Sequence, residues 1–275
     1  MIILNLNWIN LKNEILLKSR FYPWGEPSIN LNDFIDINLL KNKEVIISTR
    51  IENFLDFWLI IGLLSSLKQL NCGVYNLIIP YLPWCRQDKK EDGLPFTLEL
   101  YRDILASYNI KEITTYDIHS EKAFFLFNEK IKIRNITNFE IWKDIIIFEK
   151  NKRNELLIIW PDEGSKNRLK EYNEKLNIEI KYWEKIRNNW LVTNLEIQDL
   201  NIENKKIIVL DDICDWGKTV IELAKKINSK NLTLIITHWI FSKGVDELFK
   251  YYKKIITTNS RKTNFDKVKY YDLKI

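Results

Sequence analysis

The segment of residues 207–227, IIVLDDICDWGKTVIELAKKI, is the strongest candidate for chemistry in this chain. An apolar strand-like run leads into two adjacent carboxylates, Asp211 and Asp212, followed by a polar turn and an amphipathic helix opened by Thr219. A strand-to-helix turn presents backbone N–H groups and a helix N-terminus, which together bind anions. The carboxylates suit contacts to sugar hydroxyls or to Mg²⁺, or they serve only as an acidic helix start.

The Gly217-Lys218-Thr219 triplet in this turn is not part of a nucleotide-binding P-loop. A P-loop requires a glycine five positions before Gly217, and Asp212 occupies that position. The turn is therefore a candidate phosphate site of another kind.

Charged residues follow two other strand-like runs. Arg86 and Lys89 could neutralise part of the charge of an anionic ligand, although on their own they would be solvated loop charges. Asp117 and His119 could face one cleft and share contacts to Mg²⁺ and phosphate, although such a histidine alone is more often structural. His238, at the end of another strand-like run, is interpreted as structural.

Three more sites have both a functional and an ordinary interpretation. Asp162, in a Pro-Asp-x-Gly turn, could bind a second metal or a sugar, or serve only the turn. Lys185 and Arg187, two residues apart, would point to the same side of an extended segment and could both meet a transferring phosphoryl group, or be ordinary surface charges. Tyr22 could stack on adenine or pack near Trp24.

The elements that must position these residues alternate between strand and helix. Strands are predicted at residues 44–48, 74–80, 112–116, 155–160, 206–210 and 233–237. Helices are predicted at residues 53–70, 96–108, 166–176, 219–229 and 245–252. This alternation favours parallel sheets covered on both faces by helices. The pattern starts near Val45 and again near Glu155, with residues 131–152 as the join, which predicts two α/β units.

Composition sets wider limits. The 275 residues are 46% hydrophobic, enough for a packed core. The net charge of +5 is too balanced to indicate nucleic-acid binding. The start resembles no signal peptide, and the longest apolar run, residues 54–64, is too short to span a membrane. Three widely spaced cysteines lack a metal-binding pattern. We therefore expect a cytoplasmic protein with neither nucleic-acid nor membrane partners.

Six further motifs occur along the chain in a fixed order. They are YPWGE (22–26), PYLPWCRQDKKEDG (80–93), DIHS (117–120), WPDEGSKNR (160–168), WEKIR (183–187) and THWIFS (237–242). Residues 211–219 resemble the ribose-phosphate signature shared by type I phosphoribosyltransferases and ribose-phosphate pyrophosphokinases. The other six motifs resemble those of the pyrophosphokinases, the enzymes that make phosphoribosyl pyrophosphate.

This resemblance implies two tandem type I phosphoribosyltransferase-like domains, each a mainly parallel sheet covered by helices, with an ATP site in 1–138 and a ribose-phosphate site in 139–275. It implies that the C1 hydroxyl of the sugar attacks the β-phosphorus of Mg–ATP and expels AMP. The implied ATP-binding residues are Tyr22, Glu26, Arg86, Gln87, Asp88 and Lys89. The implied sugar-phosphate residues are Asp211, Asp212, Asp215, Trp216, Gly217, Lys218 and Thr219. The implied catalytic residues are His119, Lys185 and Arg187, and the implied Mg²⁺ ligands are Asp117, His119 and Asp162.

The chain departs from this family at the sugar-phosphate turn. The family's Asp-Thr-Gly/Cys-Gly-Thr becomes Asp-Trp-Gly-Lys-Thr here, which places Trp216 and Lys218 at small or hydroxyl-bearing positions. Trp216 could stack on a base and Lys218 could meet a diphosphate, so ADP-ribose joins ribose 5-phosphate as a candidate acceptor, as in viral relatives that rebuild NAD. Trp24 replaces a family aspartate, and the chain ends soon after Tyr271, which leaves a homo-oligomer anywhere from dimer to hexamer.

Two alternative functions remain. A phosphoribosyltransferase would need the 211–219 loop but not the Arg86-Gln87-Asp88 run or the Asp117–His119 pair. A non-catalytic, regulatory nucleotide-binding relative would have no chemical need for His119, Lys185 and Arg187, and their presence argues against it.

Overall fold

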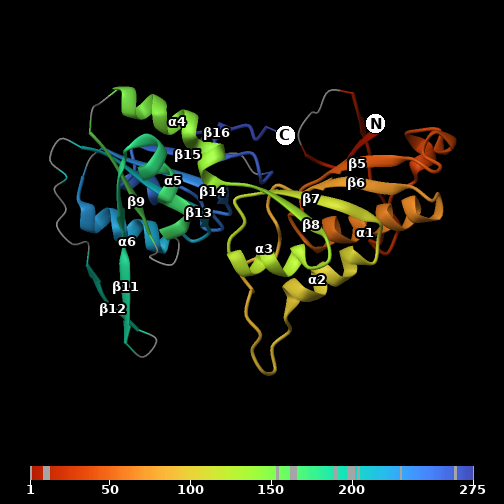
Figure 1. The fold of residues 1–275 in the computed structure, drawn as a ribbon, viewed down its shortest axis with the longest axis horizontal. Coiled ribbons are helices and arrows are strands. Elements are labelled where there is room, and N and C mark those ends of the chain that lie inside the picture. The colour runs from red at the N-terminus through yellow and green to blue at the C-terminus, as the bar shows by residue number, and fades with distance from the viewer. Residues whose placement is uncertain are drawn as a thin grey trace. The chain divides into compact units, whose positions relative to one another are not determined.

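The computed structural model describes residues 2–8, 13–152, 155–161, 166–188, 191–196, 202, 205–229, 231–262 and 265–274 of the 275. It divides into two compact units, Met1–Ile136 and Thr137–Ile275, each with its own six-stranded sheet (Figure 1). The assignment of an ATP site to one predicted domain and a sugar site to the other stays a prediction.

The sheet of the first unit is parallel throughout, in the order β2-β1-β5-β6-β7-β8. Its strands are β1 (Ile2–Asn5), β2 (Glu14–Leu16), β5 (Glu44–Ser48), β6 (Gly73–Ile78), β7 (Ile110–Tyr116) and β8 (Lys132–Ile136). A separate antiparallel hairpin consists of β3 (Arg20–Phe21) and β4 (Pro27–Ser28), and two 3₁₀ turns follow it, η1 (Leu31–Asp33) and η2 (Ile37–Leu39).

Three helices connect β5 to β8, and all three lie on one face of that sheet (Figure 1). They are α1 (Phe54–Gln69), α2 (Thr97–Ala106) and α3 (Glu121–Asn128). Successive right-handed crossovers that move in one direction along a sheet place their helices on the same side. The N-terminus of α1 is fixed by a capping box between Asn53 and Asp56.

The sheet of the second unit is also parallel, in the order β10-β9-β13-β14-β15-β16. Its strands are β9 (Leu156–Trp160), β10 (Glu179–Tyr182), β13 (Lys206–Cys214), β14 (Leu232–Trp239), β15 (Lys254–Thr258) and β16 (Lys269–Tyr271). Its helical elements are α4 (Asn138–Lys152), α5 (Lys166–Leu176), α6 (Lys218–Ile227) and the 3₁₀ turn η4 (Leu248–Lys250). Ile207 of β13 pairs with Leu157 of β9 and Leu232 of β14, so these strands start in register.

Helices cover both faces of this second sheet. Successive side chains of a strand point to opposite faces. Val209 belongs to the core cluster that contains Leu223 of α6. Thr237 accepts a hydrogen bond from Trp142 of α4 on the other face, where α4 and α5 pack together. The chain therefore reverses its direction of progress along the sheet between β9 and β13, and such a topological switch point opens a crevice at the carboxyl ends of the strands.

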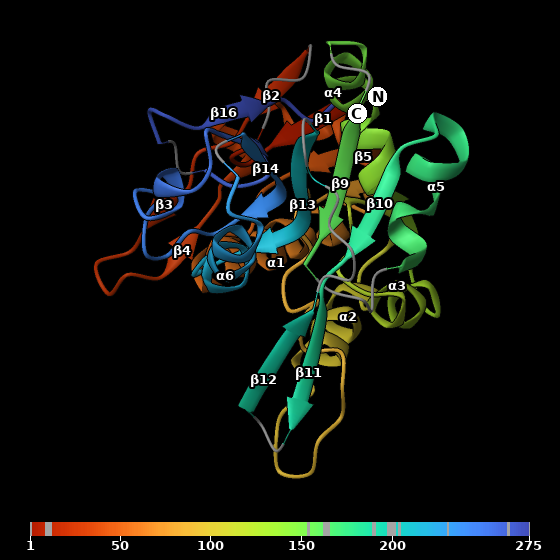
Figure 2. The ribbon, with the colours of Figure 1, turned by 90° about the vertical axis from the view of Figure 1, so that its left-hand side faces the viewer.

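A two-stranded antiparallel ribbon, β11 (Glu184–Asn188) and β12 (Leu191–Glu196), follows β10. Figures 1 and 2 show it extending away from the sheet of its own unit. Its pairing shifts register between Ile186 and Arg187.

Most predicted elements are confirmed to within a few residues, and two expectations are corrected. Residues 245–252 form the short turn η4 rather than a helix, because Tyr252 is pulled into the core, where its hydroxyl donates to the carbonyl of Val220. The predicted join, residues 131–152, contains β8 and α4. Helix α4 has no clear apolar stripe, since Ile146 is buried while Phe148 is exposed, so periodicity did not reveal it.

Helices on both faces are found in the second unit, whereas the three α-helices described in the first unit share one face. Within the described ranges, no helix is both long and apolar enough to cross a bilayer.

Candidate functional site

The 211–219 loop connects the end of β13 to the start of α6 and turns on Gly217. Gly217 has a φ of 72°, a left-handed conformation that glycine adopts without strain. A β-carbon at this position would come within 3.0 Å of Cδ2 of Leu248. A larger residue would therefore both strain the turn and push on η4, which explains the glycine.

The start of α6 has the features that favour binding of an anion. The first intrahelical hydrogen bond runs from the N–H of Ile221 to the carbonyl of Gly217. The N–H groups before it belong to the first turn, where a helix supplies no acceptor of its own, and Gly217 has no side chain with which to cap them. The helix dipole adds partial positive charge at the same place. Lys218 is exposed beside it and increases the positive potential.

The carboxylate pair lies at the switch point between β9 and β13. Asp212 is 4% exposed, and its Oδ2 accepts an ion-pair contact of 2.7 Å from Nη1 of Arg168. Arg168 lies on α5, which follows β9, and its guanidinium carbon is 5.8 Å from the ring centroid of Trp160. The two elements that flank the crevice are thus joined by one ion pair, which fixes the direction of Asp212.

The surroundings of Asp211 disfavour the ionised form of its carboxyl group. Burial, and then the neighbouring carboxyl group of Asp212, raise the pKa of Asp211 well above its usual value, while Arg168 opposes the rise. The Oδ1 of Asp211 accepts a 2.9 Å hydrogen bond from the N–H of Asp212. One arginine therefore serves two adjacent carboxyls, and a cation or hydroxyl donors placed at Asp211 would relieve the excess negative charge.

Two side chains from the loop after β14 hold the tip of the 211–219 loop. The hydroxyl of Ser242 donates to Oδ1 of Asp215 over 2.6 Å. Nζ of Lys243 lies 4.1 Å from the ring centroid of Trp216, a cation–π contact. Trp216 itself is 61% exposed, so its indole does not fill the turn.

In the first unit, Asp117 and His119 follow the end of β7. Asp117 is buried with a φ of 43°, and its N–H donates to the carbonyl of Ile136. Left-handed backbone at a non-glycine residue is uncommon and is tolerated best by Asp and Asn. His119 is half-buried, and Ser120 caps the N-terminus of α3 immediately after it. The two predicted ligands therefore lie in a backbone turn at the carboxyl edge of the sheet.

The predicted ATP-binding loop follows β6, the strand next to β7. Arg86, Gln87 and Lys89 are exposed, and Asp88 is half-buried. The turn before them is anchored by the rings of Trp84, Phe57 and Tyr101, which pack at centroid distances between 5.0 and 5.7 Å. Since β6 and β7 are parallel neighbours, this loop and the Asp117–His119 turn leave the sheet at the same edge.

Tyr22 and Glu26 lie at the tip of the β3–β4 hairpin. The N–H of Tyr22 donates to the carbonyl of Glu26, and Gly25 turns the chain with a φ of 85°. Tyr22 is 59% exposed and Trp24 is 92% exposed, which does not fit simple packing of one on the other.

The remaining predicted residues are only partly described. Lys185 and Arg187 lie on β11, whose backbone is described but whose side chains are not, and Asp162 lies outside the described residues. Within the described part of the chain, no group of three or more His, Cys, Asp or Glu side chains forms a metal cluster. His238 is buried, with Nδ1 3.1 Å from the hydroxyl of Ser260, which fits its structural interpretation.

Three residues at the site were not predicted to take part, namely Arg168, Ser242 and Lys243. Arg168 and Ser242 each end a motif quoted from the sequence, so position within the motif was an available signal. Lys243 gave no such signal in the sequence, because its contact with the ring of Trp216 depends on how the loops after β13 and β14 pack together.

Comparisons with known proteins identify a family and relatives of this chain. The model of the family described as "Phosphoribosyl transferase domain" matches residues 135–274. The chain is 27% identical over 267 residues to the ribose-phosphate pyrophosphokinase of Pyrococcus abyssi, covering 94% of this chain and 89% of that protein. It is 28% identical over 256 residues to the ribose-phosphate pyrophosphokinase of Mycoplasmopsis pulmonis, covering 85% and 76% respectively.

The fold matches the crystal structure of phosphoribosylpyrophosphate synthetase from Mycobacterium smegmatis, with a TM-score of 0.82 over 98% of this chain and 94% of that one, at 17% identity. The predicted α/β fold of two tandem, mainly parallel units covered by helices is confirmed.

Replacing Arg168 with Met should lower the free energy of unfolding at pH 7 by about 3 kcal/mol, because Asp212 would remain buried without its cation. The matched control is Lys170→Met on the same helix, which removes an exposed pair with Glu174 and should cost about 0.5 kcal/mol or less. Urea denaturation of both variants makes the comparison. Equal losses would mean that the Arg168–Asp212 pair does not anchor the crevice.

The Asp211→Asn variant should remove one pH-dependent contribution to stability. A carboxyl whose pKa is raised in the folded state binds more protons when folded, so its contribution to stability falls as pH rises above its usual pKa of 3.8 toward the raised value. In metal-free buffer the variant should therefore gain stability relative to the wild type as pH increases from 4 to 8. Parallel stability curves over that range would contradict the raised pKa.

Proposed function

We propose that this chain, which belongs to the phosphoribosyl transferase domain family and to its ribose-phosphate pyrophosphokinase branch, transfers the β,γ-pyrophosphoryl group of ATP to the C1 hydroxyl of a 5-phosphorylated ribose. The observation that carries this proposal is the start of α6, which has no side-chain cap at Gly217, beside the Asp211–Asp212 pair at the switch point of the second sheet. The products are AMP and the ribosyl 1-diphosphate.

The second unit supplies the acceptor site. The 5-phosphate of the sugar binds the N–H groups at the start of α6, where the left-handed backbone of Gly217 forms the turn into the helix, with Lys218 adding charge. Asp211 and Asp212 accept hydrogen bonds from ring hydroxyls, and Arg168 keeps Asp212 oriented for this contact. Burial makes these carboxylate contacts directional and strong, because water does not compete for them.

The first unit supplies the ATP site. Arg86 and Lys89 on the loop after β6 neutralise triphosphate charge, with Gln87 and Asp88 beside them. The exposed ring of Tyr22, on the β3–β4 hairpin, stacks on the adenine.

Mg²⁺ is the cofactor that this chemistry requires, and when bound it withdraws charge from the ATP phosphates. Asp117 and His119 of the first unit would hold it, and Asp162 of the second unit stays a ligand predicted from the sequence alone. Asp117 suits this role because its carboxylate is a hard oxygen donor and its left-handed backbone is held by hydrogen bonds on both sides of the turn.

The reaction needs alignment more than covalent participation of the protein. The C1 oxygen forms a bond to the β-phosphorus in line with the departing α,β-bridging oxygen, AMP leaves with that oxygen, and the hydroxyl proton passes to solvent. Lys185 and Arg187, on the ribbon that follows β10, stabilise charge on the transferring group.

The acceptor class extends to ADP-ribose. Trp216 is exposed rather than folded into the turn, and Lys243 covers one face of its ring. The other face suits an adenine, and the ammonium groups of Lys218 and Lys243 suit a diphosphate. We further propose a homo-oligomer as the working form.

The direct test is to incubate the purified protein with Mg–ATP and either ribose 5-phosphate or ADP-ribose, and to follow AMP and sugar products by chromatography and mass spectrometry. AMP should form only with an acceptor, and excess chelator should abolish it because the phosphates then lose their countercharge. Formation of a nucleoside monophosphate and pyrophosphate from a supplied nucleobase and phosphoribosyl pyrophosphate would indicate a phosphoribosyltransferase. Absence of AMP with either acceptor would indicate a regulatory relative.

Replacing Trp216 with Thr should change the choice of acceptor. Loss of one stacking contact of about 1 kcal/mol should lower kcat/KM for ADP-ribose roughly 5- to 10-fold and leave that for ribose 5-phosphate within about 2-fold. The Trp24→Thr variant, which removes another exposed indole in the first unit, is the matched control and should not alter the ratio. A ratio that Trp216→Thr leaves unchanged would remove ADP-ribose stacking from the account.

A further inference from the structure

A pocket of about 420 Å³ lies at the amino ends of β13, β14 and β15, the edge of the second sheet opposite the acceptor loop. Lys206 begins β13, Leu232 begins β14 and Lys254 begins β15. Asp212 lies six positions after Lys206 along β13, about 20 Å of extended chain. The pocket is therefore distinct from the acceptor site and lies within the size range of small-molecule sites.

One buried carboxylate organises this pocket. The side chain of Glu149, on α4, is 3% exposed, and each of its oxygens pairs with a different lysine. Oε1 contacts Nζ of Lys254 at 3.1 Å, and Oε2 contacts Nζ of Lys206. Burial raises the pKa of Glu149, but the hydrogen bonds from the two lysines outweigh burial and leave it lowered. Glu149 is thus an anion that holds two cations in place.

Lys206 and Lys254 each have N–H donors beyond those that contact Glu149, and these could bind a ligand. An ammonium group has three N–H donors and no acceptor. Glu149 takes donors from Lys206 and Lys254, and the remaining N–H groups of both need acceptors. Because the side chain of Lys206 is only 19% exposed, water satisfies its donors less readily than at the surface.

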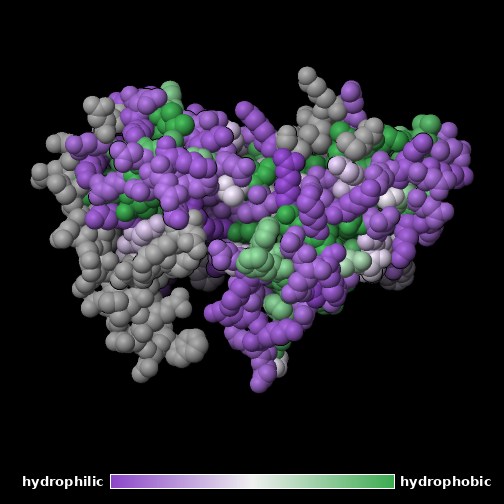
Figure 3. Space-filling view, viewed as in Figure 1, coloured by the Kyte–Doolittle hydropathy of each residue, from purple (hydrophilic) through white to green (hydrophobic). Residues whose placement is uncertain are grey.

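Two more lysines line the pocket without being neutralised by Glu149. They are Lys152, at the end of α4, and Lys253, which precedes β15. Nζ of Lys152 lies 4.0 Å from the ring centroid of Phe148. Figure 3 shows hydrophobic residues at the surface in the region of α4. Four ammonium groups and one carboxylate give the lining a formal charge of +3, and the hydroxyl-bearing Thr233 adds a neutral donor.

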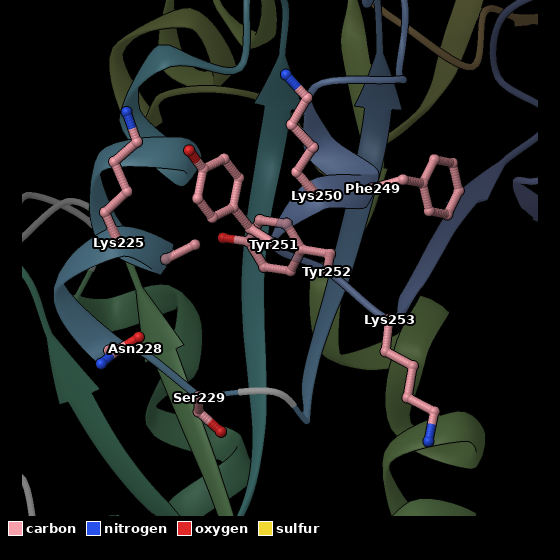
Figure 4. Close-up of a pocket in the computed structure, with 9 residues that line it drawn as sticks. Lys225, Asn228, Ser229, Phe249, Lys250, Tyr251, Tyr252 and Lys253 are labelled. Atoms are coloured by element: carbon pink, nitrogen blue, oxygen red, sulfur yellow. The ribbon is translucent and has the colours of Figure 1, made fainter.

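A neighbouring pocket of about 400 Å³ shares Lys253 but suits an anion less well. It lies at the C-terminal end of α6, where the helix dipole is negative. Lys225 lies over the ring of Tyr251, and the hydroxyl of Tyr252 is bonded to Val220. Figure 4 shows the side chain of Lys253 running away from the two tyrosine rings.

We propose that the pocket formed by Glu149, Lys152, Lys206, Lys253 and Lys254 binds a small multivalent oxyanion of the phosphate class, as a second anion site separate from the acceptor loop. Lys206 and Lys254 are set in place by Glu149 before the ligand arrives. Lys152 and Lys253 close on it and supply the charge that Glu149 does not cancel.

The test uses the full chain, inorganic phosphate as the ligand, and the double variant Lys152→Gln/Lys253→Gln. These two lysines do not pair with Glu149, so the variant should fold with an unchanged melting temperature. A matched control, Lys267→Gln/Lys269→Gln, removes the same charge from exposed positions of the same unit. Bound phosphate is counted by equilibrium dialysis at fixed ionic strength, and crystals soaked in tungstate locate the oxyanion.

The wild type and the control should bind one phosphate per chain more than the Lys152→Gln/Lys253→Gln variant, with tungstate density beside Glu149. Equal phosphate binding by all three proteins would overturn the proposal, as would tungstate confined to the start of α6. Equal losses in the variant and the control would overturn it too, because they would reflect net charge alone. None of these results depends on AMP formation, so the proposed reaction can fail while this site stands, and the reverse.

Discussion

The ion pair between Arg168 and Asp212 is the interaction on which the acceptor site depends. It joins the helix that follows β9 to the end of β13, the two elements that separate at the switch point of the second sheet. Without it, two adjacent carboxyls would lie partly buried with no cation between them, and each would disfavour ionisation of the other. With it, the orientation of Asp212 is fixed. The negative charge of Asp211 stays incompletely compensated, and a substrate that donates hydrogen bonds or brings a cation can compensate it. The adjacent carboxyls therefore lower the local stability of the fold at the place where the ligand is proposed to bind.

The same sheet treats charge differently at its two edges. At the carboxyl edge, a helix N-terminus and a glycine turn favour an anion beside two carboxylates, so the site suits a ligand with both phosphate and hydroxyl groups. At the amino edge, the single buried carboxylate of Glu149 forms ion pairs with two lysines, Lys206 and Lys254. The side chains there are mainly cationic, whereas the carboxyl edge presents carboxylates. Parallel strands place all their ends of one kind together, which is why each edge can develop a separate character.

Much of this could be read from the sequence because the functional loops follow strands with strong β patterns. Apolar runs located β5, β9 and β14, and the Asp211–Thr219 loop was recognised from a strand, two carboxylates, a glycine and a helix in succession. Contacts between loops could not be read in this way. Lys243 and Trp216 are 27 positions apart in the sequence. Glu149 is 57 positions from Lys206 and still further from Lys254. Helix α4 was missed because it is apolar on more than one side.

The central claim is that a pyrophosphoryl group moves as one piece from ATP to the acceptor bound at the β13–α6 loop. The most direct measurement follows ATP labelled with ³²P at the β position through a single turnover with ribose 5-phosphate or ADP-ribose. The account predicts that the label appears in the sugar product while AMP is unlabelled. Label retained in ADP would show transfer of the γ-phosphoryl group alone, and that result would contradict the account.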